Sequence, residues 1–340
     1  MPEQICLVPR LQGLGGMVSF QAKFIQELDR RGIDHSFDPA DPLNTAILVI
    51  GGTRHLLPLL RARRRGLHIV QRLNGMNWLH KVQKTNLQSW LRSVNANNLL
   101  NFIRRYVCHE IIYQSEFSHT WWESEHGGLN KLNHVVYNGV DLNTYSPIGE
   151  EKQAIDRFSI LLVEGHLTQA SAGGLEIAMQ LVKSLRERLI LPVELIVVGD
   201  VLASVQVVCQ QKFPSVNVHW TGIVPHTDIP TLDRSAHLLF SADLNAACPN
   251  SVLEALACGL PVLAYDTGSL SELIQEGAGS VVPWGSNYWR LEPPDLPALV
   301  EAAILILQNN GKYRQAARQR AEQVFSLEAM VDAYLEVLLK

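Results

Sequence analysis

Residues 246–265, AACPNSVLEALACGLPVLAY, contain a short polar turn, an apolar helical segment and an apolar strand in succession. The helix should start at the turn 249–251 and end at Gly259, since glycine commonly terminates helices. Glu254 is then expected in the first turn, where free N–H groups and a carboxylate suit a phosphate next to a ribose. The alternative is a capping box, in which Ser251 and Glu254 only satisfy N–H groups of the helix.

The run PNSVLEALACGLPV at 249–262 resembles the nucleotide-sugar motif of glycosyltransferase family 4, the retaining enzymes of the GT-B fold. Further matches to this family follow in the family's order along nearly the whole chain. They are GGM at 15–17, YNGVD at 137–141, VGD at 198–200, TGIV at 221–224 and the segment 267–272. The resemblance implies an α/β protein with two Rossmann-like, doubly wound parallel sheets that face a cleft.

The composition is that of a globular protein with two domains. The chain has 340 residues, of which 47% are hydrophobic and 18% charged, and domains usually contain roughly 100–200 residues. The first domain is expected at 1–148, completed by a C-terminal helix at about 327–340, and the second at 149–326. In the GT-B fold the first would face the acceptor and the second would bind the nucleotide sugar.

The sequence lacks the signals of export and of a membrane span. No apolar run reaches the roughly 18 residues that would indicate a spanning helix, and the N-terminus reads as a first strand rather than a signal peptide. The five cysteines show neither C-x-x-C spacing nor a zinc pattern, so we expect free thiols in a reducing cytoplasm.

Short apolar runs alternate with helical patterns, which predicts parallel sheets covered by helices. The expected strands of the first half lie at residues 5–8, 46–50, 68–70, 110–113 and 134–137. Those of the second half lie at residues 160–163, 193–198, 216–219, 237–240, 262–265 and 280–282. A long helical stretch is expected at 78–105 and a last helix at 327–339, which the resemblance places back against the first domain.

Charge is distributed unevenly along the chain. Up to residue 148 there are 16 Lys/Arg against 11 Asp/Glu, a net charge of +5, and the remainder carries 13 against 22, a net charge of −9. The basic excess is concentrated in six arginines: Arg61, Arg63, Arg64, Arg65, Arg104 and Arg105. They predict peripheral contact with anionic lipid at the inner face of a membrane or with an acidic acceptor, and the alternative is a solvated helix end. Nucleic acid is not expected as a partner, because no aromatic residues interleave with the cations.

The resemblance assigns the donor site to the second domain. Glu254 would hold the ribose hydroxyls, turn residues after Gly222 would flank the base, and backbone groups of the helix start would contact the donor. The residues of this helix start are Asn250, Ser251 and Val252.

In the first domain, Gly15 and Gly16 allow a positive-φ turn and close approach to a phosphate before a helix. Val18 stands where a G-x-G-x-x-G pattern needs its last glycine. A dinucleotide-dependent oxidoreductase is therefore a minor alternative.

The implied reaction moves a sugar from a nucleoside-diphosphate sugar to a hydroxyl of a glycan, lipid or small molecule with retention. In such enzymes the leaving phosphate takes the acceptor's proton, so the protein mainly positions groups and stabilises the departing diphosphate. No Asp-x-Asp sequence occurs, so neither a metal nor a cofactor other than the donor is expected.

The donor site departs from the family pattern at three places. Ala246 replaces a glutamate, a contact that Asp243 or Asn245 would then supply. His166 replaces an arginine, and residues 168–174 lack the usual lysine. We expect His166 to be catalytic and the N–H groups of Ser171, Gly173 and Gly174 to form a nest for the diphosphate. An ordinary linker is the alternative for this loop, and a non-catalytic nucleotide- or glycan-binding protein is the alternative for the chain.

The stretch at 71–78, QRLNGMNW, is the candidate acceptor site, because it follows a strand of the first domain. Arg72, Asn74 and Asn77 would hydrogen-bond a sugar, and Trp78 would stack on it. A structural turn before a capped helix is the alternative.

Overall fold

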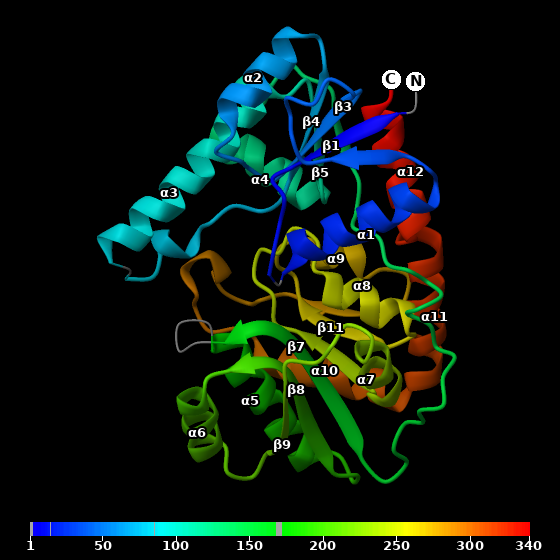
Figure 1. The fold of residues 1–340 in the computed structure, drawn as a ribbon. Coiled ribbons are helices and arrows are strands. Elements are labelled where there is room, and N and C mark those ends of the chain that lie inside the picture. Colours follow the sequence, from blue (N-terminus) through cyan, green and yellow to red (C-terminus); the bar gives the residue numbers. More distant parts are fainter. Residues whose placement is uncertain (1–2, 14, 85, 168–171) are drawn as a thin grey trace. The chain divides into compact units, whose positions relative to one another are not determined.

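The computed structural model describes residues 3–13, 15–84, 86–167 and 172–340 (Figure 1). The chain divides into two compact units: unit 1 consists of Met1–Gly139 and Leu327–Lys340, and unit 2 of Val140–Ser326. The boundary expected after residue 148 therefore lies inside unit 2. Among the described residues, no helix is both long and apolar enough to pass through a membrane.

Unit 1 contains a six-stranded sheet in the order β2-β1-β3-β4-β5-β6, in which all the pairs are parallel. The strands are β1 Gln4–Val8, β2 Asp34–Ser36, β3 Ala46–Ile50, β4 His68–Leu73, β5 Glu110–Tyr113 and β6 Asn133–Val135. The helices are α1 Gly16–Arg30, α2 Leu56–Arg64, η1 Leu79–Lys81, α3 Leu87–Phe102, η2 Ile103–Val107, α4 Glu116–His126 and α12 Leu327–Leu338. Strands β1 and β3 are buried along their whole length, which explains their continuous apolar sequences.

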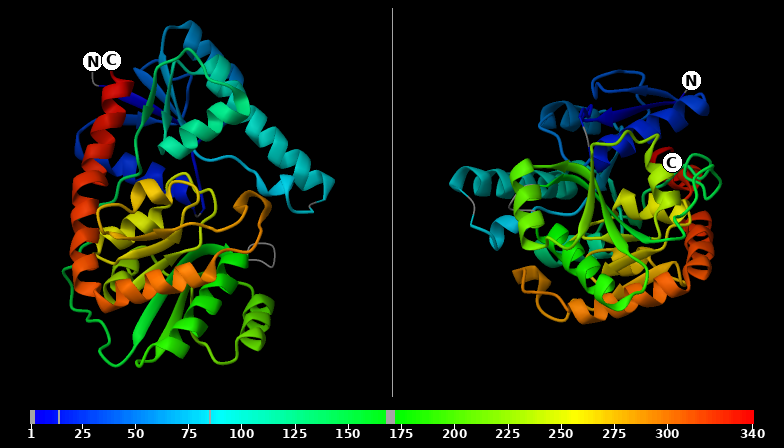
Figure 2. Two further views of the ribbon diagram at one scale, coloured as in Figure 1. Left: turned by 180° about the vertical axis from the view of Figure 1, so that it is seen from behind. Right: turned by 90° about the horizontal axis from the view of Figure 1, so that it is seen from below.

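Unit 2 contains a second parallel sheet of six strands in the order β12-β11-β10-β7-β8-β9. The strands are β7 Phe158–Leu167, β8 Val193–Val201, β9 Asn217–Gly222, β10 Leu238–Ser241, β11 Val262–Tyr265 and β12 Gly279–Val282. The helices are α5 Gly173–Arg188, α6 Ala203–Lys212, α7 Ile229–Ser235, α8 Asn250–Ala257, α9 Leu270–Leu273, η4 Tyr288–Arg290, α10 Leu296–Gln308 and α11 Asn310–Val324. Helices α5 and α10 pack on one face, and α7, α8 and α11 on the other (Figures 1 and 2).

The α/β class with two doubly wound parallel sheets is thus confirmed, with two corrections to the expected elements. The short edge strand β2 was not predicted, because its sequence Asp-His-Ser is polar and only half-buried. The long helix expected at 78–105 is divided into η1, α3 and η2, the last of which is a π-helical turn.

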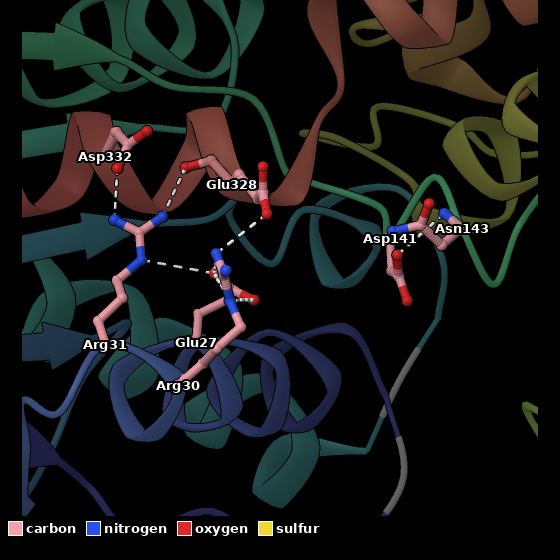
Figure 3. A network of polar contacts seen from close by, with 7 residues as sticks. All are labelled: Glu27, Arg30, Arg31, Asp141, Asn143, Glu328 and Asp332. Atoms are coloured by element: carbon pink, nitrogen blue, oxygen red, sulfur yellow. Dashed lines mark hydrogen bonds and ion pairs between the residues drawn. The ribbon is translucent and has the colours of Figure 1, made fainter.

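Helix α12 belongs to the core of unit 1, where Tyr334 packs against Phe20 and Phe24 of α1 with ring centroids 5.2 and 5.6 Å apart. Around these rings, ion pairs join the two helices (Figure 3). Arg30 lies 3.0 Å from Glu328, and Arg31 pairs with Asp332. Because exposed ion pairs contribute little, the aromatic contacts provide most of the stabilisation.

The glycine of the linker sequence YNGVD has a packing role in unit 1. A Cβ on Gly139 would lie 2.6 Å from the Cα of Leu327, where α12 begins. The N–H of Gly139 also donates to the Sδ of Met330 at 3.0 Å. The linker can therefore pass α12 closely only because residue 139 has no side chain.

The order of the strands predicts where a ligand binds in each unit. Ligands of doubly wound sheets bind beyond the carboxyl ends of the strands, where the strand order reverses. In unit 1 the order reverses between β1 and β3, and in unit 2 between β7 and β10. The segments that follow these strands are the first places to look for a site.

Candidate functional site

The segments that follow β7, β10 and β11 meet at the carboxyl edge of the sheet in unit 2. A Cβ on Gly174, at the start of α5, would lie 2.5 Å from the Cβ of Ala242, directly after β10. The hydroxyl of Thr267 donates to the main-chain oxygen of Asp243 at 2.9 Å, and the N–H of Ser269 donates to that of Ala246 at 3.0 Å. The segment after β10, which leads into the donor motif, and residues 267–269 are therefore neighbours.

Helix α8 starts at Asn250 with Pro249 as its N-cap and without a side-chain cap. The capping box that Ser251 and Glu254 could have formed is therefore absent. Because the helix starts before Ser251, Glu254 lies in the second turn. The prediction that Glu254 lies in the first turn is therefore wrong. The side chain of Val252 is fully buried, which leaves only main-chain groups of this residue to a ligand.

Glu254 is 5% exposed, and its carboxylate lies close to the hydroxyl of Tyr145, whose pKa is raised by burial and by the negative charge of Glu254. The same hydroxyl lies 3.4 Å from the main-chain oxygen of His226. His226 belongs to the turn after β9, which starts at Gly222 with a φ of 70°. The structure therefore brings Glu254 near the turn expected to flank the base. Sequence reasoning missed Tyr145, because nothing in the linker indicates which helix it contacts.

Asp233 of α7 lies close to Glu254 and is 1% exposed. Burial raises the pKa of Asp233 well above its usual range, and the negative charge of Glu254 raises it further. Asp233 therefore keeps its proton at higher pH than an ordinary aspartate. A neutral Asp233 limits the repulsion that Glu254 would otherwise meet in the interior of unit 2.

A second carboxyl pair lies where the strand order reverses. Glu164 is near the end of β7, and Asp243 follows β10, which pairs with β7. Burial, together with the negative charge of Asp243, raises the pKa of Glu164 to about 8. The pKa of Asp243 is also raised by burial, although a hydrogen bond of 3.4 Å from Ser241 opposes this. The pair thus retains a proton at neutral pH.

His166 has an acidic partner at the same edge. Its Nδ1 lies 2.8 Å from Oδ2 of Asp200, which is its register partner on β8, and both side chains are about half exposed. With Glu164 and Asp243, the segments after β7, β8 and β10 carry three carboxyl groups. The residues 164–174, 199–203 and 242–249 contain no Lys or Arg. These segments therefore offer no Lys or Arg side chain to a diphosphate.

The start of α5 contains the described part of the expected nest. Ala172 has helical backbone angles, φ −74° and ψ −5°, and Gly173 and Gly174 are the first helical residues. Residues 172–174 therefore present the N–H groups of a helix start. Ser171 lies outside the described residues, so the nest stays a prediction. A Cβ on Gly173 would meet no atom of the described residues within 4 Å.

The glycine loop of unit 1 has the predicted backbone. Gly15 has a φ of 120° and directly precedes α1, which starts at Gly16 without a side-chain cap. A Cβ on Gly15 would meet no atom within 4 Å. Only the left-handed φ requires glycine there, and the role of Gly15 and Gly16 in donor binding stays a prediction.

The candidate acceptor residues hold the loop after β4 in place. Arg72 is 1% exposed, donates to Asn74 at 3.1 Å and to Asn138 at 2.7 Å, and lies over the ring of Phe20. The N–H of Asn77 donates to Oδ1 of Asn97 on α3 at 3.0 Å.

Trp78 is 9% exposed, so little of its ring is available for stacking. The hydrogen bonds of Arg72, Asn74 and Asn77 give these residues a structural role. It stays a prediction that they and Trp78 also bind an acceptor.

Comparison with known proteins identifies the family. The family of glycosyl transferases group 1 matches residues 151–324, which is most of unit 2. The chain belongs to this family. Its membership agrees with the resemblance of residues 249–262 to glycosyltransferase family 4. None of the curated proteins compared with the sequence matches it significantly.

Solved glycosyltransferases share the fold over almost the full length. Sucrose-phosphate synthase from Thermosynechococcus elongatus is 15% identical with a TM-score of 0.74, over 99% of this chain and 98% of that one. WaaG, a glycosyltransferase involved in lipopolysaccharide biosynthesis, is 15% identical with a TM-score of 0.69, over 97% and 99%. Anabaena HepE in complex with UDP and glucose is 18% identical with a TM-score of 0.67, over 99% of both chains. These likenesses establish the GT-B fold.

The site of this group 1 glycosyltransferase offers a carboxylate and main-chain N–H groups to a ligand. Among the described residues, no group of three or more His, Cys, Asp or Glu side chains is placed to hold a metal ion. Glu254 offers carboxylate oxygens suited to the hydroxyls of a ribose, and the starts of α5 and α8 offer N–H groups suited to phosphates.

Proposed function

We propose that this protein is a retaining, metal-independent glycosyltransferase that uses a nucleoside-diphosphate sugar as donor and a hydroxyl group as acceptor. The observation that carries the proposal is the placement of Glu254. It lies on the donor-motif helix α8, next to the hydroxyl of Tyr145 and close to the turn after β9. Binding of UDP and UDP-glucose by Anabaena HepE, which has the same fold, supports a uridine nucleotide as the first donor to test.

In this proposal each part of unit 2 has one task. Glu254 accepts hydrogen bonds from the ribose hydroxyls, and Tyr145 holds its carboxylate. The N–H groups at the starts of α5 and α8 stabilise charge on the departing diphosphate. His166, paired with Asp200, would donate a hydrogen bond to the diphosphate. A phosphate oxygen of the leaving group takes the proton of the acceptor hydroxyl.

Tyr145 is the residue that this assignment adds to the sequence-based donor site. Its side chain is 4% exposed, and it joins Glu254 to the turn after β9 without itself belonging to either element. We assign it as a positioning residue, which acts on the ribose through Glu254.

A second candidate function is nucleotide or glycan binding without catalysis. The lack of Lys and Arg in residues 164–174, 199–203 and 242–249 favours it, because no permanent cation of these segments would offset the charge of a diphosphate. Nucleotide binding with no sugar transfer to any acceptor would support this second function. The proposed location is the cytoplasm, with peripheral contact to a membrane through unit 1.

The test is calorimetric titration of UDP, GDP and ADP into the protein and into Glu254→Gln. We expect the best of these nucleotides to lose about ten- to a hundredfold in affinity, as for a hydrogen bond to a charged group. Tyr145→Phe should lose about two- to tenfold, because Tyr145 acts on the ribose only through Glu254. EDTA should leave all affinities unchanged.

The matched control ligand is the 2′,3′-dideoxy form of the same nucleotide, which has no ribose hydroxyls. Both variants should bind it as the wild type does. Equal losses for the ribose and dideoxy ligands would contradict a contact between Glu254 and the ribose. No binding of any of the three nucleotides would refute the proposed function itself.

A further inference from the structure

Helix α3 exposes apolar side chains at its N-terminal end, where it projects away from the sheet of unit 1 (Figures 1 and 2). The exposed fraction is 72% for Leu87, 42% for Trp90 and 44% for Leu91. Leu79 and Val82, from η1 and the residue after it, are also exposed. We call these residues the α3 tip: Leu79, Val82, Leu87, Trp90 and Leu91.

The α3 tip is a fixed part of the fold. Asn86 caps the helix by accepting a hydrogen bond from the N–H of Ser89 at 2.8 Å. The rings of His80 and Trp90 lie 6.3 Å apart, so η1 is next to the first turns of α3. In the middle of the helix, Asn97 donates to the main-chain oxygen of Asn77 at 2.8 Å. Capping and these contacts hold the apolar residues outward.

Helix α3 also lacks the buried apolar stripe of an ordinary surface helix. Asn97 is its one buried residue, and Leu99 and Leu100 near its C-terminal end are partly buried beside Gly52. At its N-terminal end, Leu87, Trp90 and Leu91 expose apolar surface to solvent, and an apolar partner that covered them would gain the free energy of burying this surface.

The stretch of sequence that contains the α3 tip is basic. Between Asp41 and Glu110 the sequence contains 11 Lys/Arg and no acidic residue. Among the described residues, the side chains of five exposed cations of this stretch make neither a hydrogen bond nor an ion pair: Arg54, Arg61, Arg64, Lys84 and Arg92. In the sequence, Lys84 lies between Val82 and Leu87 and Arg92 follows Leu91, whereas Lys81 is paired with Glu125 of α4 at 2.6 Å.

Most of the other arginines expected to meet a membrane have structural partners instead. Arg63 donates to the main-chain oxygen of Val107 at 2.6 Å, and Arg65 to that of Pro39 at 2.9 Å. Arg104 is fully buried and donates to Tyr113, and Arg105 donates to the main-chain oxygen of His126. The apolar tip of α3 is therefore a better anchor than the arginine cluster.

We infer that the α3 tip inserts into the interface of an anionic lipid surface, with Lys84 and Arg92 at the level of the headgroups. Tryptophan prefers this interface, leucine side chains enter the acyl boundary, and unopposed cations attract anionic lipids. The charge complementarity favours this partner over a neutral surface. The inference does not depend on the nucleotide site.

The experiment is co-sedimentation of the full-length protein with vesicles of equal parts phosphatidylcholine and phosphatidylglycerol. We expect binding that weakens with salt and is lost with phosphatidylcholine alone. The double variant Trp90→Gln, Leu91→Gln should lose about tenfold or more in vesicle affinity. It should keep the thermal unfolding midpoint and the UDP affinity of the wild type.

The matched control is Val207→Gln, Val208→Gln on α6, which changes two similarly exposed apolar residues of unit 2. This variant should bind vesicles as the wild type does. Absence of vesicle binding by the wild type, or unchanged binding by the α3 variant, overturns the inference. So does retention on an anionic polysaccharide without vesicle binding, which would make this surface an acceptor site.

Discussion

Glu164 and Asp243 lie near the carboxyl ends of the neighbouring parallel strands β7 and β10. Protonation of Glu164 is therefore linked to the free energy of unfolding. Burial and the charge of Asp243 raise the pKa of Glu164 to about 8. In the unfolded chain a glutamate releases its proton at about pH 4.3. The folded protein therefore binds more protons than the unfolded chain between these values. By linkage, the free energy of unfolding falls as the pH rises through this interval.

We predict that Glu164→Gln removes much of this pH dependence. The amide cannot ionise, so the variant avoids the cost of a buried charge, about 1.4 kcal/mol for each unit of raised pKa. Urea unfolding at about pH 6 and about pH 8.5 measures the effect. The wild type should be less stable at the higher pH and the variant nearly equally stable at both. The same slope in both proteins would contradict a raised pKa at Glu164.

Other features at the residue scale follow from the sequence to different extents. Gly15, Gly222 and Gly259 adopt positive φ, as local turn and helix-end signals indicate. The partners of Glu254 and His166 could not be predicted. Tyr145 is more than 100 positions from Glu254, and no periodicity records which side chains meet across a fold.

At the scale of elements, the two glycines that start α5 have different roles. Gly174 lies against Ala242, so an added Cβ would come within 2.5 Å of another Cβ, whereas Gly173 faces open space. The start of α5 therefore touches the segment after β10 only because residue 174 lacks a side chain. This contact positions the N–H groups of the helix next to the donor segment.

We predict that Gly174→Ala lowers the free energy of unfolding by about 1–3 kcal/mol, the usual cost of overpacking. Gly173→Ala is the matched control and should be neutral or stabilising by up to about 1 kcal/mol, because alanine favours a helix. Thermal unfolding of both variants checks this. Equal effects of the two substitutions would show that α5 does not pack against Ala242.

The elements themselves were largely predictable, with errors where the sequence signal is weak. Apolar runs gave the strands of both units, since strands buried on both faces have continuous hydrophobic sequences. Strand β2 is polar and gave no such signal. The start of α8 at Asn250 falls within the predicted turn 249–251, but Glu254 was assigned to the first turn because Ser251 and Glu254 fit a capping box.

At the scale of the whole molecule, the C-terminal helix α12 packs against the first elements of the chain. Helix α12 contributes Met330, Val331, Tyr334, Val337 and Leu338 to the core of unit 1. Unit 2 has its own core, centred on α5, α10 and their sheet. The last 14 residues are therefore required for one unit and not for the other.

We predict that a chain truncated after residue 326 loses the fold of unit 1 and retains that of unit 2. Without Tyr334, the rings of Phe20 and Phe24 would be exposed to water. Hydrogen exchange read by mass spectrometry should show β1 and β3 unprotected and β7 and β10 protected. The control Glu328→Gln, Asp332→Asn removes only exposed ion pairs and should cost less than about 1 kcal/mol. Persisting protection of β1 in the truncated chain would contradict this prediction.

The sequence by itself determined the α/β class, most strands and the family, through apolar periodicity, glycine placement and the donor motif. These signals are local, since each is carried by residues within one element or one turn. Only the tertiary structure decided that Glu254 contacts Tyr145, that Glu164 and Asp243 share a site, and that α3 exposes its apolar tip. Each of these depends on which surfaces of distant segments are covered when the chain packs, and packing is not encoded at any one place in the sequence.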